Sequence, residues 1–115
     1  MVGVEPFIAV YMLASRKHGT LYVGVTSDLI SRTVQHRDGV FEGFTKRYGV
    51  TRLVWYETFD LITDAIRREK QLKKYKREWK LNLIEAMNPN WDDLFLELLA
   101  PPTNPSSPGV SPGDP

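Results

Sequence analysis

The chain has 115 residues, a formal net charge of +1 and no cysteine. This length suits one domain with a single modest core, and the lack of cysteine excludes disulfides and thiolate metal sites. No run approaches the ~18 apolar residues of a membrane span, and no basic, apolar leader stands at the N-terminus. We therefore expect a cytoplasmic protein with no membrane partner.

Two strands and a helix are expected first. Residues 7–14 and 20–26 are rich in β-branched and aromatic side chains, and the polar segment between them suits an antiparallel hairpin. Residues 27–39 then carry apolar side chains at helical spacing, with a capping Ser or Thr before them and Gly39 at their end. A plain hairpin needs neither Tyr11 nor Tyr22, so we expect another group or molecule to contact these two side chains.

A third strand and more helices are expected next. Residues 51–59 have an apolar centre typical of a strand, and residues 60–76 form a helix in which Asp60 or Thr63 is the expected cap. Residues 76–87 form a further helix, and 92–100 add a last turn. The apolar stripe expected on the helix at 60–76 is Ile62, Ala65, Ile66 and Leu72. The order is therefore β-β-α-β-α-α.

The C-terminal residues differ in composition from the rest. Residues 101–115 are nearly all Pro, Gly, Ser, Asp, Asn and Thr. Such a segment cannot bury enough apolar surface to offset the entropy of ordering it. We expect a domain at 1–100 and a disordered tail at 101–115 that holds no site.

Positive charge is concentrated in one segment. Residues 67–80 contain eight Lys or Arg and two Glu, a local balance of +6, so the remaining residues sum to −5. This asymmetry is typical of a surface that faces phosphate groups. A helix with a solvated charged face is the alternative.

Short motifs link the chain to a known family. AVY at 9–11 and YVG at 22–24 resemble the two halves of the GIY-YIG nuclease motif, although only the Tyr of the first half is kept. Arg32 stands where the family has its arginine, and Glu69 where it has its metal-binding glutamate. The segments GFTKRYGVTRLVWYE, REKQLKKYKREWKLNLI and NPNWDDL resemble the small stand-alone bacterial branch of this superfamily, over about residues 6–96.

The resemblance implies a compact α/β (α+β) fold with a three-stranded, mainly antiparallel sheet flanked by helices. It also implies a metal-dependent endonuclease that hydrolyses phosphodiester bonds, in DNA more than RNA, with structure-selective cutting in repair or recombination. One Mg²⁺ or Mn²⁺ would be held by Glu69, with waters and phosphate oxygens completing its shell. Independently, Glu69 lies on the inward stripe of its helix and needs a partner there, for which a nearby Lys or Arg is the alternative to a metal.

Five further residues have expected roles, and the resemblance implies those of Arg32 and the two tyrosines. Arg32 would clamp the phosphate in the transition state, and His36, four residues later, would shuttle a proton. Tyr22 is the favoured base, with Tyr11 hydrogen-bonding and positioning the water, although a phenol of pKa ~10 is a poor base at pH 7. Gly24 would let a phosphate approach closely. The alternatives are a solvated arginine, a polar surface histidine and one purely structural tyrosine.

Two later positions are less constrained. Lys46 would contact a phosphate or assist proton transfer, or be a plain solvated lysine. Asn88 resembles the family's late asparagine, which supports the site, but it could instead cap the turn before Pro89. Its rivals for this role are Asn82 and Asn90.

The basic helix would steer the nucleic-acid backbone through contacts that do not depend on base sequence. We expect Trp79 and Trp91 in the core rather than as platforms for stacked bases. The residues expected to contact phosphates are Arg67, Lys70, Lys73, Lys74, Lys76 and Arg77.

Two other classes of function compete with the nuclease. The degenerate first tripeptide and the lack of a separate recognition domain favour a non-catalytic nucleic-acid-binding module with the same fold. An interaction protein without a nucleic-acid role would treat the basic helix as solvated and the tyrosines as core. Cleavage assays with branched, nicked, single-stranded and duplex DNA separate the three.

Overall fold

The computed structural model describes residues 6–38 and 47–99, and the expected tail at 101–115 lies outside them. The order β-β-α-β-α-α is confirmed among the described residues, and the short helix α5 follows where a last helical turn was expected. Within the described ranges, no helix has the length and apolar character needed to cross a membrane. The elements are β1 (Ile8–Ala14), β2 (Leu21–Thr26), α1 (Leu29–Arg37), β3 (Arg52–Phe59), α3 (Ile62–Lys73), α4 (Arg77–Met87) and α5 (Phe95–Leu99).

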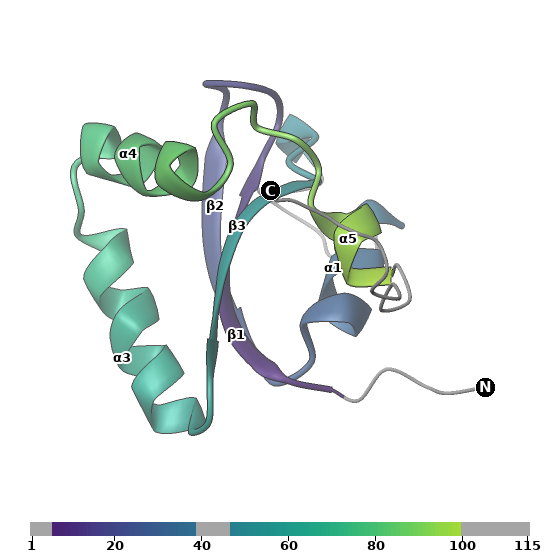
Figure 1. The fold of residues 1–115 in the computed structure, drawn as a ribbon, viewed down its shortest axis with the longest axis vertical. Coiled ribbons are helices and arrows are strands. Elements are labelled where there is room, and N and C mark those ends of the chain that lie inside the picture. The colour runs from purple at the N-terminus through teal and green to yellow at the C-terminus, as the bar shows by residue number, and fades with distance from the viewer. Residues whose placement is uncertain (1–5, 39–46, 100–115) are drawn as a thin grey trace, which may run out of the picture.

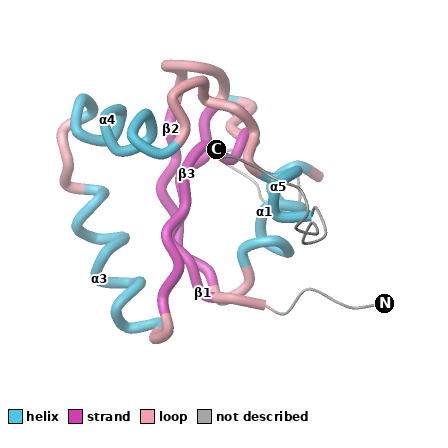
Figure 2. Tube along the Cα trace, in the orientation of Figure 1, coloured by secondary structure: helices cyan, strands magenta, loops and turns pink. Residues whose placement is uncertain are grey.

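The three strands form one antiparallel sheet in the order β2-β1-β3. This confirms the expected α+β fold with a three-stranded antiparallel sheet. Helices α3 and α4 lie on one side of the sheet, and α1 and α5 lie on the other (Figure 1). The tube view shows the same arrangement, with the strands in magenta between two pairs of helices (Figure 2).

Side chains of β1 alternate between the two faces, as the period of two in a strand requires. Val10 and Met12 point to the α3/α4 side, whereas Tyr11 and Leu13 point to the α1/α5 side. All four are fully buried, because β1 is the central strand and both its faces are covered. The α1/α5 side also buries Ala9, Leu29, Val50, Leu53 and Leu94.

A bulge interrupts the pairing of β1 with β3. Met12 lies opposite Trp55 while Leu13 lies opposite Leu53, so Val54 is an extra residue on β3. The carbonyl of Val54 accepts a hydrogen bond from the side chain of Asn88 instead, at 3.1 Å. The bulge therefore ties β3 to the segment that follows α4.

Both predicted helix caps differ from those found. Asp28 caps α1, because its carboxylate accepts a hydrogen bond from the Ser31 amide at 3.2 Å; the expected Ser or Thr does not. Helix α3 begins after Leu61, which makes no side-chain cap, so neither Asp60 nor Thr63 fills that role. The apolar stripe predicted for α3 is only partly correct. Ala65 and Leu72 are fully buried, while Ile62 and Ile66 are 40% and 37% exposed.

Helix α4 buries a face other than the one that carries its tryptophan. Ile84 is fully buried, whereas Trp79 is 47% exposed and Met87 is 43% exposed. The prediction that Trp79 lies in the core is wrong, because the helix is rotated so that this side chain faces outward. Trp91 is fully buried, which confirms its place in the core.

Candidate active site

The side chain of Tyr11 leans across β2 directly over Gly24, the residue opposite it in the sheet. A Cβ atom added at Gly24 would lie 2.5 Å from both the Cζ and the hydroxyl oxygen of Tyr11. That distance is well inside a van der Waals contact, so only glycine fits there. We expected this glycine to admit a phosphate, but the space above it holds the Tyr11 ring.

The hydroxyl of Tyr11 lies at the centre of a group of polar side chains. It is hydrogen-bonded to the side chain of Arg32 and lies 3.1 Å from Nε2 of His36. Because a guanidinium can only donate, the Tyr11 oxygen accepts from Arg32 and keeps its own proton. It donates that proton to His36 when the neutral imidazole carries its hydrogen on Nδ1.

The pKa shifts of these groups agree with this direction of hydrogen bonding. Burial raises the pKa of Tyr11 well above its usual range, and the nearby Tyr22 and Glu69 raise it further, while Arg32 opposes them. Burial also lowers the pKa of His36, and the charge of Arg32 lowers it further. Tyr11 therefore stays protonated and His36 stays neutral around pH 7.

Tyr22 completes an aromatic group with the same two residues. Its ring centroid lies 6.3 Å from that of Tyr11 and 5.5 Å from that of His36. Tyr11 is fully buried and His36 is 6% exposed, so the alternative of a polar surface histidine is wrong. Tyr22 is only partly buried, which makes it the motif tyrosine that solvent reaches.

Glu69 lies on α3, which packs against β2. Its charge makes the smallest of the contributions that shift the pKa of Tyr11, and it raises that pKa. The Glu69 side chain is 14% exposed, and one of its oxygens lies 2.6 Å from Nζ of Lys73. The ion pair weighed as an alternative partner is thus formed, with a lysine one helical turn further on.

A single divalent cation fits this carboxylate. Mg²⁺ keeps several waters and often binds through one or two carboxylates together with substrate phosphate. Among the residues that the structure describes, no group of three or more His, Cys, Asp or Glu could hold a metal, so an all-protein cage is not formed there. Glu69 could hold such an ion once the exposed Lys73 moves away from it.

The basic residues of α3 and α4 differ in what they contact. Arg77 donates to the carbonyls of His18 and Gly19, at 2.8 and 2.7 Å, so it holds the β1–β2 hairpin; we had expected a phosphate contact. Arg67 is exposed and lies 3.2 Å from Asp64. Three exposed lysines form no ion pair within the described ranges: Lys70, Lys74 and Lys76.

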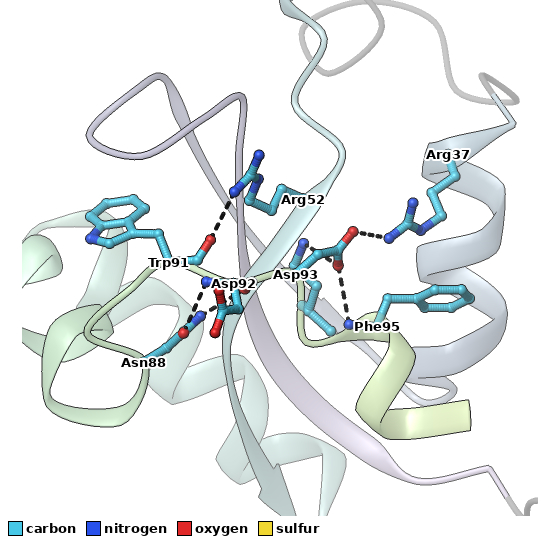
Figure 3. A network of polar contacts seen from close by, with 8 residues as sticks. Arg37, Arg52, Asn88, Trp91, Asp92, Asp93 and Phe95 are labelled. Atoms are coloured by element: carbon cyan, nitrogen blue, oxygen red, sulfur yellow. Dashed lines mark hydrogen bonds and ion pairs between the residues drawn. The ribbon is translucent and has the colours of Figure 1, made fainter. Parts of the chain in front are cut away.

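Asn88 lies in a different network, which Figure 3 shows. Its side-chain amide donates to the carbonyls of Val54 and Asp92, at 3.1 and 2.8 Å, and its oxygen accepts from the Asp92 amide at 3.0 Å. Asn88 is 4% exposed, and its recorded partners are all backbone groups. It supports the turn after α4 and is not among the groups that contact Tyr11. Lys46 lies outside the described residues.

The same network fixes the residues that follow the turn (Figure 3). The backbone of Trp91 has a φ of +59°, which is strained for a bulky residue, and Arg52 donates to its carbonyl at 3.0 Å. Asp93 forms an ion pair with Arg37 and accepts from the amides of Leu53 and Phe95, at 3.3 and 3.1 Å. Sequence reasoning missed this network, because nothing in the pattern shows which distant amides a carboxylate will meet.

Known proteins resemble the chain in sequence. The GIY-YIG catalytic domain family matches residues 7–82. The UPF0213 protein SSP2268 of Staphylococcus saprophyticus is 37% identical over 68 residues, which is 59% of this chain and 83% of that protein. The UPF0213 protein SERP0126 of Staphylococcus epidermidis is 34% identical over 67 residues, or 58% of this chain and 82% of that protein. The solution NMR structure of the UPF0213 protein BH0048 from Bacillus halodurans is 29% identical, with a TM-score of 0.48, and the match covers 75% of this chain and 90% of that one.

Proposed function

Because this chain belongs to the GIY-YIG catalytic domain family, we propose that it is a metal-dependent endonuclease that hydrolyses phosphodiester bonds in DNA. Structure-selective cutting during repair or recombination is the use we assign to it. The observation that carries the proposal is one group of contacts. Around a single buried hydroxyl lie groups that phosphodiester hydrolysis can use, from β1, β2 and α1: Tyr11, Tyr22, Arg32 and His36. The charge of Glu69, on α3, also acts on that hydroxyl.

Arg32 binds the scissile phosphate in this proposal. A planar guanidinium offers paired donors that match two phosphoryl oxygens, and its positive charge stabilises the charge that develops in the transition state. The hydrogen bond to Tyr11 fixes the orientation of the guanidinium before the substrate arrives. Tyr11 is therefore a positioning residue, since its fully buried side chain has no exposed surface on which to hold a water.

Tyr22 is the residue we assign to proton removal from the attacking water. Of the two motif tyrosines it is the one that solvent reaches, whereas Tyr11 is buried and has a raised pKa. Tyr22 would take the proton of the water while it gives up its own hydroxyl proton, and His36 is the base we assign to accept that proton, since it is neutral near pH 7 and its ring centroid lies 5.5 Å from that of Tyr22. The positive charge of Arg32 disfavours a protonated His36, so transfer of the proton from His36 to solvent is favourable.

Glu69 would hold the divalent ion, Mg²⁺ or Mn²⁺. The ion supplies positive charge beside the phosphoryl oxygens and the leaving group. Displacement of Lys73 from Glu69 is part of loading the site, so the ammonium would be free to contact a neighbouring phosphate. This gives Lys73 two partners at different stages, the carboxylate before binding and the nucleic acid afterwards.

A binding module without turnover is the second candidate, and the Lys73–Glu69 ion pair is the observation that favours it. If Lys73 never leaves, Glu69 holds no cation and the chain binds nucleic acid without cutting it. The two candidates differ in whether DNA is cut.

The test is cleavage of branched, nicked, single-stranded and duplex DNA by the purified protein in Mg²⁺ or Mn²⁺. We expect cutting of at least one substrate, and a loss of about 10³-fold or more in Glu69→Gln, because the ion's ligand is gone. Glu97→Gln is the matched control, since Glu97 is an exposed carboxylate on α5, and it should cut normally. Cutting that persists in Glu69→Gln, or DNA binding with no cutting by the native protein, overturns the proposal.

A further inference from the structure

The outer face of α4 carries an open groove of about 460 Å³. Trp79 is its most informative lining residue, because this large indole is 47% exposed in a protein that buries its other two tryptophans. The ring of Tyr75 meets the indole edge-on, with centroids 5.3 Å apart and an interplanar angle of 89°. The groove is lined by Tyr75, Trp79, Asn82, Leu83 and Ala86.

A second hollow of about 370 Å³ lies beside α3 and the end of β3. Arg68 connects the two, because its Nη1 donates to Gln71, which lines the second hollow, and lies 3.5 Å from the hydroxyl of Tyr75, which lines the first. Arg68 also bonds Glu57 on β3, at 2.9 Å, so this surface lies at the β3 side of α3. We call the two hollows together the α3–α4 groove; the second is lined by Phe59, Asp64, Arg67, Arg68 and Gln71.

Positively charged side chains lie beside the aromatic residues of the groove. Nζ of Lys76 lies 5.7 Å from the centroid of the Trp79 ring, and Lys74 is exposed one residue before Tyr75. The acidic groups of the second hollow are already paired, Asp64 with Arg67 and Glu57 with Arg68. Among the groove-lining residues and their printed partners, three cations stand against two carboxylates: Arg67, Arg68 and Lys76 against Asp64 and Glu57.

We propose that the α3–α4 groove binds an unpaired stretch of the nucleic-acid substrate, with a base stacked on Trp79 and the flanking phosphates on the surrounding cations. An exposed aromatic ring beside lysines is the combination that binds single strands without sequence preference, since every base has a π-face. The excess of positive charge favours this polyanion over an apolar peptide or a second copy of this equally basic surface.

The inference rests on the proposed nuclease function and narrows its substrate. Bases within a duplex are stacked on one another, so they cannot reach an indole without being unpaired. Tyr22 packs on the α1/α5 side of the sheet, whereas α4, which lines the Trp79 hollow, lies on the other side, so the strand that reaches Trp79 must pass around the sheet. A flexible single strand can do this. The expected substrate is therefore DNA with a single-stranded segment next to the cut site.

Binding in EDTA tests this inference without any cleavage. Fluorescence of Trp79 should be quenched when the native protein is titrated with single-stranded oligothymidine, since Trp55 and Trp91 are 6% and 0% exposed. Trp79→Ala should weaken oligothymidine binding by about 5- to 150-fold, the range for removing one stacked base, while blunt duplex binding changes by less than about twofold. Trp79→Phe should recover part of the affinity. Leu96→Ala is the control, because Leu96 is 69% exposed on α5 and its removal should change neither affinity.

Three results would overturn the inference: equal losses for single strand and duplex, no loss in Trp79→Ala, or no quenching. A fourth result would be that the groove joins two copies of this chain. In that case Trp79→Ala would lower the mass measured by light scattering and leave oligothymidine binding unchanged. Because no metal is present, the outcome is independent of the cleavage test. Trp79-dependent binding by a protein that never cuts would keep this inference and reject the nuclease.

Discussion

Two polar networks lie in this small protein, and they are built in opposite ways. Around Asn88 and Asp93, side chains bond mostly to backbone amides and carbonyls of neighbouring segments (Figure 3). Around Tyr11, side chains from β1, β2 and α1 meet one another, the charge of Glu69 on α3 acts on them, and each can titrate, bind phosphate or hold a cation. The first network holds a turn in place, and the second concentrates chemistry at one point.

The comparison shows how to distinguish side chains that support the fold from side chains that take part in the reaction. A side chain whose hydrogen bonds all end on backbone groups contributes to the shape of the chain, so its loss should lower stability. A side chain whose partners are other titratable side chains, close to solvent, should affect turnover with little change in stability. Variants in each network should therefore have opposite effects on unfolding and on cleavage.

After Glu69→Gln, Tyr22→Phe has the largest expected effect on turnover. Removal of a general base typically lowers the rate by about 10²- to 10⁴-fold, and the fold should be unaffected because Tyr22 is only partly buried. Cleavage rates and urea unfolding measured on the same preparation give both quantities. Tyr11→Phe, the companion variant, should lose less activity, and an equal or larger loss in Tyr11→Phe would reverse the roles of the two tyrosines.

Asn88→Ala is the largest expected effect on stability. The carbonyl of Val54 and the amide of Asp92 would lose their partners in a buried place, which we expect to cost about 2–4 kcal/mol in the free energy of unfolding. Urea denaturation measures this loss. The folded fraction should cut DNA at the native rate. A stable Asn88→Ala variant with no activity would instead move Asn88 into the catalytic group.

Gly24→Ala should affect both quantities, because this glycine lies under the Tyr11 ring. The new methyl group would meet the Tyr11 Cζ and hydroxyl at 2.5 Å, so the ring must move away from Arg32 and His36. Forcing a methyl group into a packed site costs about 1–3 kcal/mol. Thermal unfolding and cleavage rates measure the two effects. Gly49→Ala would not serve as a control, because the φ of +63° at Gly49 strains any side chain. A native-like Gly24→Ala enzyme would contradict the close contact.

The smallest expected effect is the dependence on pH. The folded-state pKa of His36 lies below the ordinary 6.5, so the neutral imidazole is retained at pH 7 and is lost only as the pH falls through that lower value. Activity should be flat near neutrality and then fall by about tenfold per pH unit on the acid side. Stability should also decline as the pH falls from about 6.5, because the unfolded chain takes up the proton first.

The pH profile of His18→Gln is the control for this prediction. His18 is exposed and bonded to Glu85, so its loss should leave the acid limb in place. His36→Gln should move or remove that limb. An acid limb that survives unchanged in His36→Gln would show that another group carries it.

The fold was predictable from local patterns, and the site only in part. Enrichment in β-branched and aromatic residues predicted β1 and β2, an apolar centre predicted β3, and helical spacing predicted α1, α3 and α4 with ends within a few residues. The bulge at Val54 could not be foreseen, since it depends on the pairing of two distant strands. The rotation of α4 that exposes Trp79 was equally hidden, because both faces of that helix carry apolar side chains.

Individual residues show which features of the site could be predicted from the sequence and which could not. The motif pointed to Tyr11 and Tyr22, but it gave no sign that Tyr11 would be fully buried and turned toward Gly24. The spacing of Glu69 and Lys73, four apart on one helix, already allowed the ion pair that forms. Arg77 could not be told from its lysine neighbours by composition, although it alone bonds the hairpin carbonyls.

Binding of Mn²⁺ followed by NMR tests the central claim most directly, because the protein has two histidines in different places. A paramagnetic ion at Glu69 should broaden the ring resonances of His36 and Tyr22 while those of His18 stay sharp. The broadening should disappear in Glu69→Gln. Broadening of His18 equal to that of His36, or broadening of His36 that persists in Glu69→Gln, would contradict the account.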